Sequence, residues 1–199
     1  MNPSKRLRLA LVILAAAVAA FVFADFHLAK SNTNTSSNRT SAHTAAPDDY
    51  QPGNMLLYIA AGDDNTLSQA LAQAVFDHAG TSGYFSPVLL ANTPQADQFP
   101  SVLVSASGEK FLWTPVYSQS TLKIKLVFSN FRAVDSIDSG PETIIFPAQN
   151  DSPAIEGSSQ AEQVDQSFGL ISLPGYRRLI TRSAAKSVVE NLIEIVKLD

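Results

Sequence analysis

A serine and a lysine that could act together stand one helical turn apart, at Ser183 and Lys186. They match the S-x-x-K pattern of serine acyl-transferases that act on cell-wall peptides and β-lactams, in which the lysine assists deprotonation of the serine. The S-D-N and K-T-G motifs that complete such a site do not occur in the sequence. We therefore expect both residues to lie on a helix surface, and the sequence assigns no catalytic residue.

The other residues that could take part in catalysis or metal binding do not form a recognisable pattern in the sequence. The only histidines are His27, His43 and His78, and no two of them have the i, i+4 spacing of a helical zinc site. Residues 63–65 read Asp-Asp-Asn, but no EF-hand loop follows, so helix capping is the better interpretation. Because no nucleotide-binding glycine motif occurs either, the sequence predicts no metal and no cofactor.

One aromatic stretch, "FLWTPVY" at residues 111–117, is a candidate contact surface for a partner. A proline cannot donate to a strand ladder, so it favours an edge strand, and an edge strand can accept a strand from another protein. The alternative is a core aromatic residue beside a proline kink. The candidate contact residues are Phe111, Trp113, Pro115 and Tyr117.

The N-terminus carries a basic flank followed by an apolar run. The cations are Lys5, Arg6 and Arg8, and an uncharged stretch of Ala, Leu, Val, Ile and Phe follows over residues 9–24. We expect residues 9–29 to be a transmembrane anchor, since a helix needs about 20 residues to cross a bilayer. The alternative is a signal peptide cleaved after Ala24, which would make the mature protein secreted and soluble.

Both interpretations give one topology. Cationic residues are retained on the cytoplasmic side of a membrane, so residues 1–8 form a cytoplasmic tail and the rest of the chain lies outside the cytoplasm. We expect a single-pass protein of the cytoplasmic (inner) membrane with its C-terminal domain in the periplasm, and the lipid bilayer as a partner through residues 9–29.

The amino-acid composition excludes several kinds of site and one kind of partner. The chain has 199 residues and no cysteine, which excludes a disulfide framework, a thiolate metal site and an acylated cysteine. Beyond residue 50, nine Lys and Arg stand against fifteen Asp and Glu, a net charge of −6. An acidic domain repels phosphate backbones, so nucleic acid is not an expected partner.

Periodicity outlines the domain. Residues 30–53 are rich in Ser, Thr and Asn and predict a flexible tether, whereas residues 54–199 predict one folded domain. We expect strands at 54–61, 84–91, 99–106, 110–118, 121–129 and 142–148, with a tight turn at "SGEK" (107–110) and a long loop or irregular edge at 149–167. We expect helices at about 65–80 and 175–197. The second helix should face the sheet with Tyr176, Ile180, Ala184, Val188, Leu192 and Ile195, and should turn Arg178 and Arg182 to water. The predicted fold is α+β, an N-terminal transmembrane helix followed by a mainly antiparallel sheet of about five to six strands with two helices on one face, in the order β-α-β-β-β-β-β-α.

The expected function follows from this layout. We expect a membrane-anchored binding or assembly module of the cell envelope, with another envelope protein as its partner and no catalytic activity evident in the sequence. The alternatives are a small envelope hydrolase with an unrecognised site and a secreted soluble protein.

Overall fold

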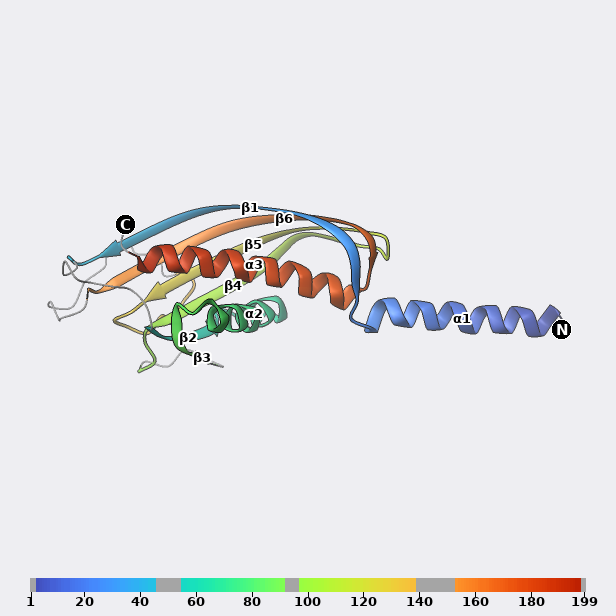
Figure 1. The fold of residues 1–199 in the computed structure, drawn as a ribbon, viewed down its shortest axis with the longest axis horizontal. Helices are drawn as coiled ribbons and strands as arrows, with labels where there is room; N and C mark the ends of the chain where they lie inside the picture. Colours follow the sequence, from blue (N-terminus) through green and yellow to red (C-terminus); the bar gives the residue numbers. More distant parts are fainter. Residues whose placement is uncertain (1–2, 46–54, 92–96, 139–152, 198–199) are drawn as a thin grey trace.

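The computed structural model describes residues 3–45, 55–91, 97–138 and 153–197, with side chains from residue 7 onward. Within these ranges the chain forms three helices and one six-stranded sheet (Figure 1). In chain order the elements are α1 (Pro3–Phe23), β1 (His27–His43), β2 (Met55–Ala61), α2 (Thr66–Ser82), β3 (Phe85–Leu90), β4 (Ser101–Trp113), β5 (Tyr117–Ser129), β6 (Ile155–Ile171) and α3 (Leu173–Val196). The α+β class is confirmed.

The sheet is mixed, which corrects the mainly antiparallel sheet predicted from the sequence. Its strand order is β1-β6-β5-β4-β2-β3. The ladders that join β1, β6, β5 and β4 are antiparallel, whereas β2 runs parallel to both β3 and β4. The cause lies in the connections: α2 returns the chain to the starting end of β2, so β3 must run in the same direction as β2.

The first strand replaces the greater part of the predicted tether. Residues 30–53 were expected to be flexible because they have almost no large apolar side chain, yet His27–His43 pair with β6 along their whole length. The backbone ladder supplies partners that composition cannot reveal, and Thr33 adds a side-chain hydrogen bond of 2.6 Å to Asp165 of β6. Residues 46–54 lie outside the described residues.

The prediction of a long loop or irregular edge at 149–167 is also wrong over most of its length. Residues from Ile155 onward form β6, which lies between β1 and β5. Its helix-facing side carries small or polar residues, among them Gly157, where a Cβ would lie 2.6 Å from Ile195 of α3. A strand that needs small side chains for a close helix shows no hydrophobic alternation, and for this reason the sequence pattern was missed. The strand predicted at 142–148 lies outside the described residues.

The strands predicted at 99–106 and 110–118 are one strand. The segment "SGEK", predicted to be a tight turn, instead forms a β-bulge between Gly108 and Lys110 inside β4. The chain reverses later, at Thr114, whose backbone N–H donates to the carbonyl of Tyr117. A bulge adds one residue to a strand and changes which side chains face each side of the sheet.

The two domain helices were predicted correctly. Asn65 caps α2 by accepting a hydrogen bond from the N–H of Leu67, and α2 ends before Gly83, which adopts a left-handed φ of 72°. Ser172 caps α3 in the same way through the N–H of Gly175. Both helices lie on one face of the sheet (Figure 1). The predicted stripe of α3 is buried, with Tyr176, Ile180, Ala184, Val188, Leu192 and Ile195 all in the core.

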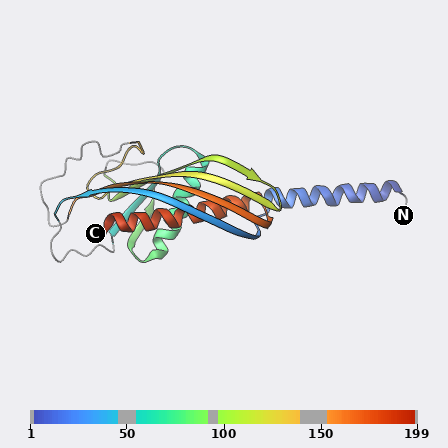
Figure 2. The same cartoon turned by 90° about the horizontal axis from the view of Figure 1, so that it is seen from above.

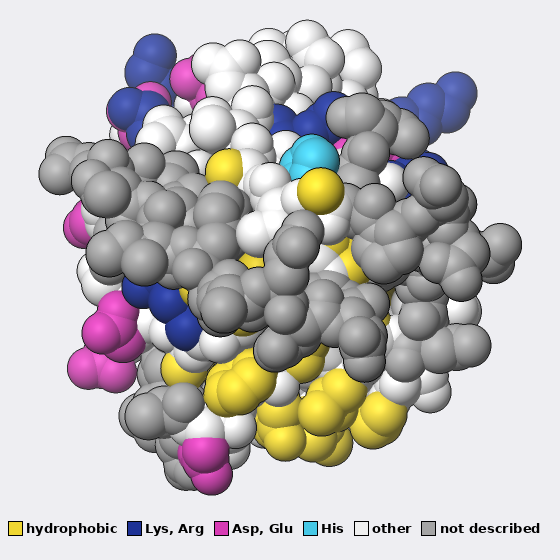
Figure 3. All heavy atoms as spheres, turned by 90° about the vertical axis from the view of Figure 1, so that its left-hand side faces the viewer, with side chains coloured by type: hydrophobic (Ala, Val, Ile, Leu, Met, Phe, Trp, Pro, Cys, Tyr) yellow, Lys and Arg dark blue, Asp and Glu magenta, His cyan; other side chains and the backbone are white. Residues whose placement is uncertain are grey.

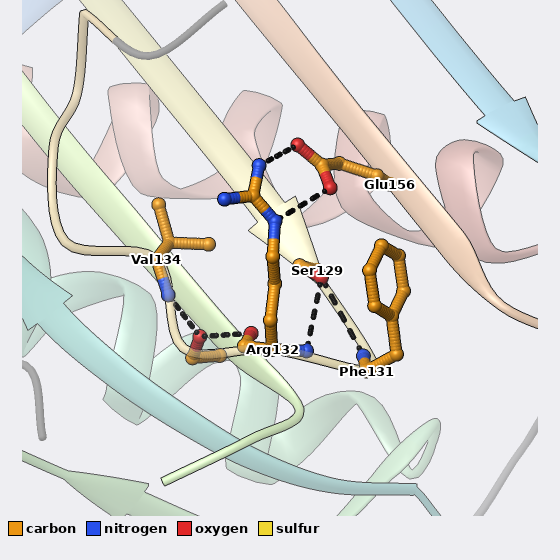
Figure 4. A network of polar contacts seen from close by, with 6 residues as sticks. Ser129, Phe131, Arg132, Val134 and Glu156 are labelled. Carbon is orange, nitrogen blue, oxygen red and sulfur yellow. Dashed lines mark hydrogen bonds and ion pairs between the residues drawn. The ribbon is translucent and has the colours of Figure 1, made fainter. Parts of the chain in front are cut away.

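The other face of the sheet carries a smaller apolar cluster under a strap of chain after β5. Val134 of this strap packs with Leu103 and Val127. Arg132 holds the strap to the buried Glu156 of β6 through two hydrogen bonds of 3.0 and 2.6 Å (Figure 4). A paired guanidinium and carboxylate in this planar geometry form a strong, directional link.

The first helix extends away from the sheet and the other helices (Figure 1, Figure 2). It ends at Phe23, and residues 27–29 already belong to β1, so the predicted anchor 9–29 is not one continuous helix. Within the part of the chain that the structure describes, no helix has both the length and the apolar character needed to cross a membrane.

The buried stripe of α3 gives a first prediction. Leu192→Ala should lower the free energy of unfolding by about 2–5 kcal/mol, because Leu192 is buried against the sheet and its removal leaves a cavity. Lys186→Ala, on the exposed side of the same helix, should change it by less than about 0.5 kcal/mol. Denaturant unfolding followed by circular dichroism measures both, and equal effects would contradict the assigned burial.

The pairing of β1 gives a second prediction. A chain that starts at Gln51 lacks β1 and should melt at a lower temperature, or aggregate, compared with a chain that starts at Asp25. The physical reason is that β6 loses one of its two partner strands and the buried Asp165 loses Thr33. Thermal melts with size-exclusion chromatography measure the difference. Identical melting curves would show that β1 contributes nothing to the fold.

Candidate functional site

A groove of about 730 Å³ opens between α2 and α3. Its floor is formed by side chains of β4 and β5, and Val22 from the end of α1 reaches its margin. Ligand sites in proteins are concave, mostly apolar and lined by a few polar groups. We call this feature the α2–α3 groove; its lining residues are Val22, Thr66, Leu67, Ala70, Gln73, Ala74, Asp77, Gly108, Phe111, Leu122, Leu173, Pro174, Arg177, Arg178, Ile180, Thr181 and Arg182.

The floor of the groove is apolar because the bulge in β4 redirects Phe111. Before the bulge, Val102 and Val104 face the helices, and the extra residue makes Phe111 face them too. The ring of Phe111 lies 5.6 Å from that of Tyr176, yet the residue is 46% exposed. A large aromatic side chain thus remains accessible next to Leu122 on the groove floor.

The rim of the groove is basic along α3. Arg177, Arg178 and Arg182 line it within six residues of sequence, whereas the whole chain has a net charge of −4. Arg178 pairs with Asp25 at 2.6 Å. Among the described residues, Arg177 and Arg182 form no ion pair of their own.

One carboxylate opposes this charge. Asp77 of α2 also lines the groove, and it accepts a hydrogen bond of 3.0 Å from Gln73. The α3 side of the groove therefore attracts anions, and the α2 side carries the single negative charge of Asp77.

The groove borders a strand with a free edge. The ladder between β2 and β4 ends at the pair Ala61 and Val104, so the later part of β4 is paired only with β5 within the described ranges. The sequence associated this free edge with Pro115, but Pro115 lies in the turn between β4 and β5, where its carbonyl accepts the N–H of Ile171.

The structure divides the four predicted contact residues. Phe111 and Trp113 face the helices, and Trp113 donates a hydrogen bond of 3.2 Å to the carbonyl of Ile171. Tyr117 lies on the opposite face of the sheet, where its ring is 4.9 Å from that of Phe168. Only Phe111 lines the α2–α3 groove.

A second group of polar side chains is buried between the sheet and α3. Asp165 accepts hydrogen bonds from Thr33 and Ser167. The hydroxyl of Tyr176 lies near Asp165 and Ser120, but it forms no hydrogen bond of normal geometry with a described residue. Burial raises the pKa of Tyr176 well above 10, and the charge of Asp165 adds to the rise. Because Asp165, Ser167 and Tyr176 are fully buried, a substrate has no access to them, and the group is structural.

The other sequence candidates are apart from the groove. Lys186 lies 3.8 Å from Glu190 on the surface of α3, and the acyl-transferase hypothesis for Ser183 receives no support from the groove lining. Asp63 and Asn65 serve the start of α2, as expected. No cluster of metal-binding side chains exists within the described ranges.

A further exposed apolar surface lies at the edge of the sheet. The edge strand β3 exposes Leu89 and Leu90, each 41% accessible. Figure 3 shows the end of the domain opposite α1, where hydrophobic side chains gather at the lower part of the face. Nothing in the described structure indicates what would cover this surface.

Comparisons with known proteins add little. No protein-family model matches the chain, and no curated protein matches it. Among solved structures it is similar to the PelC dodecamer from Paraburkholderia phytofirmans, with 12% identity, a TM-score of 0.32, and 81% of this chain and 99% of that chain covered. A single-site variant of that dodecamer gives 11% identity, a TM-score of 0.30, and 80% and 98% coverage. Neither likeness is close enough to carry a functional argument.

The buried hydroxyl of Tyr176 yields a third prediction. Tyr176→Phe should leave the free energy of unfolding unchanged or raise it by up to about 1 kcal/mol, because the hydroxyl it removes is buried without a partner. Tyr117→Phe is the matched control, since it loses a 3.0 Å hydrogen bond to Gln119 and should cost about 0.5–1.5 kcal/mol.

The same variant tests the pKa. Because the pKa of Tyr176 is raised in the folded state, ionisation of this hydroxyl opposes folding. The free energy of unfolding is therefore unaffected by it below pH 10 and falls as the pH rises above 10. Unfolding curves recorded on either side of pH 10 should show a smaller alkaline loss for Tyr176→Phe than for the unmodified chain. An equal loss would mean that Tyr176 titrates normally.

Proposed function

We propose that the chain is a membrane-anchored binding module of the cell envelope, in which α1 enters the membrane and the domain lies outside the cytoplasm. The observation that carries the proposal is the exposure of α1. Its apolar side chains face solvent on every side, with Leu9 52%, Val12 65% and Leu14 61% accessible. A helix that is apolar all round belongs in a protein core or in a bilayer.

The apolar part of α1 is shorter than a full membrane span, so the proposed role depends on the basic flank as well. At about 1.5 Å per residue, its 21 residues extend about 31 Å, close to the thickness of a bilayer core. The apolar part begins only at Leu9, so Arg8 must extend its side chain to the membrane surface. Lys5, Arg6 and Arg8 orient that end toward the cytoplasm.

The junction between α1 and the domain supports an anchor that also holds the domain in a fixed position relative to α1. Only three residues separate α1 from β1, which replaces the flexible spacer that the sequence suggested. Ser172, the cap of α3, accepts the N–H of Phe26 at 3.0 Å and donates to its carbonyl at 3.0 Å. The pair Asp25 and Arg178 adds a 2.6 Å contact at the same place.

The binding role rests on the α2–α3 groove. The groove lies where α1 joins the domain, with Val22 at its margin, and it combines an exposed aromatic floor with a basic rim. A partner envelope protein at the free edge of β4 stays a prediction.

The fourth prediction tests the anchor and its orientation together. Fuse alkaline phosphatase, which is active only after export, behind Asp199; the fusion should be active and should remain with membranes after carbonate extraction. Leu14→Arg should release it, because an arginine at the centre of a span costs about 2.5–3.5 kcal/mol. Ser41→Arg, on the exposed edge strand β1, is the control and should stay in the membrane fraction.

The intact mass of the exported protein separates the two interpretations of the N-terminus. A mass that includes residues 1–24 is expected for an anchor. A soluble product that begins at Asp25 would establish a cleaved signal peptide, and a stable but inactive fusion would contradict the topology.

A further inference from the structure

We infer that the α2–α3 groove binds an anionic lipid with a single acyl chain, with the chain on the groove floor and a phosphate headgroup on the arginines of α3. The inference rests on the proposed membrane attachment only for the source of the ligand. The groove itself is a property of the domain.

The floor fits an acyl chain because it is apolar. Leu67 and Ala74 of α2, Leu122 of β5 and Ile180 of α3 line the groove together with Phe111. None of the polar side chains that line the groove comes from β4 or β5, so no side chain of the floor offers a hydrogen bond to a polar ligand. Burial of each methylene of an acyl chain contributes about 0.8 kcal/mol, so a chain of ordinary length gains enough to compete with a bilayer.

The rim fits a phosphate because it concentrates guanidinium groups without matching carboxylates. Asp25 balances Arg178, and Asp77 lies on the opposite helix, hydrogen-bonded to Gln73. Arg177 and Arg182 remain as cations without an ion pair among the described residues. Guanidinium groups bind phosphate oxygens in pairs, which a single lysine cannot do.

The position of the groove explains how a lipid would reach it. Val22, at the end of α1, lines the groove together with Leu173 and Pro174 at the start of α3. If α1 lies in the membrane, this margin is at the membrane surface, where an acyl chain can leave the bilayer without crossing much water. The net negative charge of the chain does not oppose this, because the positive charge is local to α3.

Photo-crosslinking of the full chain tests the inference. The protein is placed in nanodiscs of neutral phosphatidylcholine that contain a little lysophosphatidic acid with a diazirine near the end of its acyl chain. Crosslinked peptides should include residues of the groove floor, such as Leu67, Phe111 or Leu122, in addition to α1.

Two matched pairs of variants make the result specific. Ala70→Trp fills the groove from an exposed position on α2 and should reduce groove labelling by about tenfold, whereas its neighbour Gln69→Trp, outside the groove lining, should not. Arg177→Gln combined with Arg182→Gln should reduce labelling by the phosphate lipid about fivefold. Labelling by a second probe, a neutral monoacylglycerol with the same diazirine, should not change. Lys186→Gln, elsewhere on α3, is the charge control.

The outcomes are distinguishable from those of the proposed function. Retention of the protein in nanodiscs with labelling confined to α1, or groove labelling that Ala70→Trp does not reduce, overturns the inference and leaves the anchor intact. If the protein does not enter nanodiscs, the anchor fails, and the same probe added to the full chain in neutral detergent still tests the groove. Labelling in detergent that Ala70→Trp removes would support the inference, and absence of labelling would overturn it. Far-ultraviolet circular dichroism confirms that each variant is folded.

Discussion

The close packing of α3 along the sheet is the constraint on which the other features depend. The helix buries a stripe from Tyr176 to Ile195 and lies so near β6 that Gly157 has no room for a side chain. The strand under the helix must therefore carry small side chains at the closest approach, and a buried carboxylate on it needs hydrogen-bond donors from the protein. Thr33 of β1 and Ser167 donate to Asp165, so the outermost strand contributes to the interior.

The same packing creates the groove. Next to α3 lies α2. The ladder between β2 and β4 ends at Val104, so the rest of β4 has no strand on that side within the described ranges. Phe111, which the β4 bulge turns toward the helices, covers part of the groove floor next to this free edge. A cavity with an aromatic floor and a basic edge is thus a consequence of where the parallel part of the sheet ends, and it requires no special loop.

How much was predictable depended on the distance over which each element is stabilised. The cap at Asn65 and the apolar stripe of α3 depend on residues that are one helical turn apart, and both were predicted correctly from the sequence. β1 and β6 are more than a hundred residues apart and gain their order from each other, so each in isolation had the composition of a loop.

The site divides in the same way. Phe111 was noticed because its aromatic stretch is unusual, whereas Arg178 and Arg182 were assigned to water as the outer side of an amphipathic helix. Three arginines within six residues beside Pro174 were the available signal. What they line depends on α2, on the bulge and on the end of α1, and no local pattern contains that information.

The short junction at Phe26 has a mechanical meaning. An α-helix turns about 100° per residue, and α1 is fastened to the domain at Phe26 by hydrogen bonds. An insertion of one residue near the end of α1 would therefore turn the preceding part of the helix by about 100° relative to the domain. Under the proposed membrane attachment, the number of residues in α1 fixes which side of the helix shares its orientation with the α2–α3 groove.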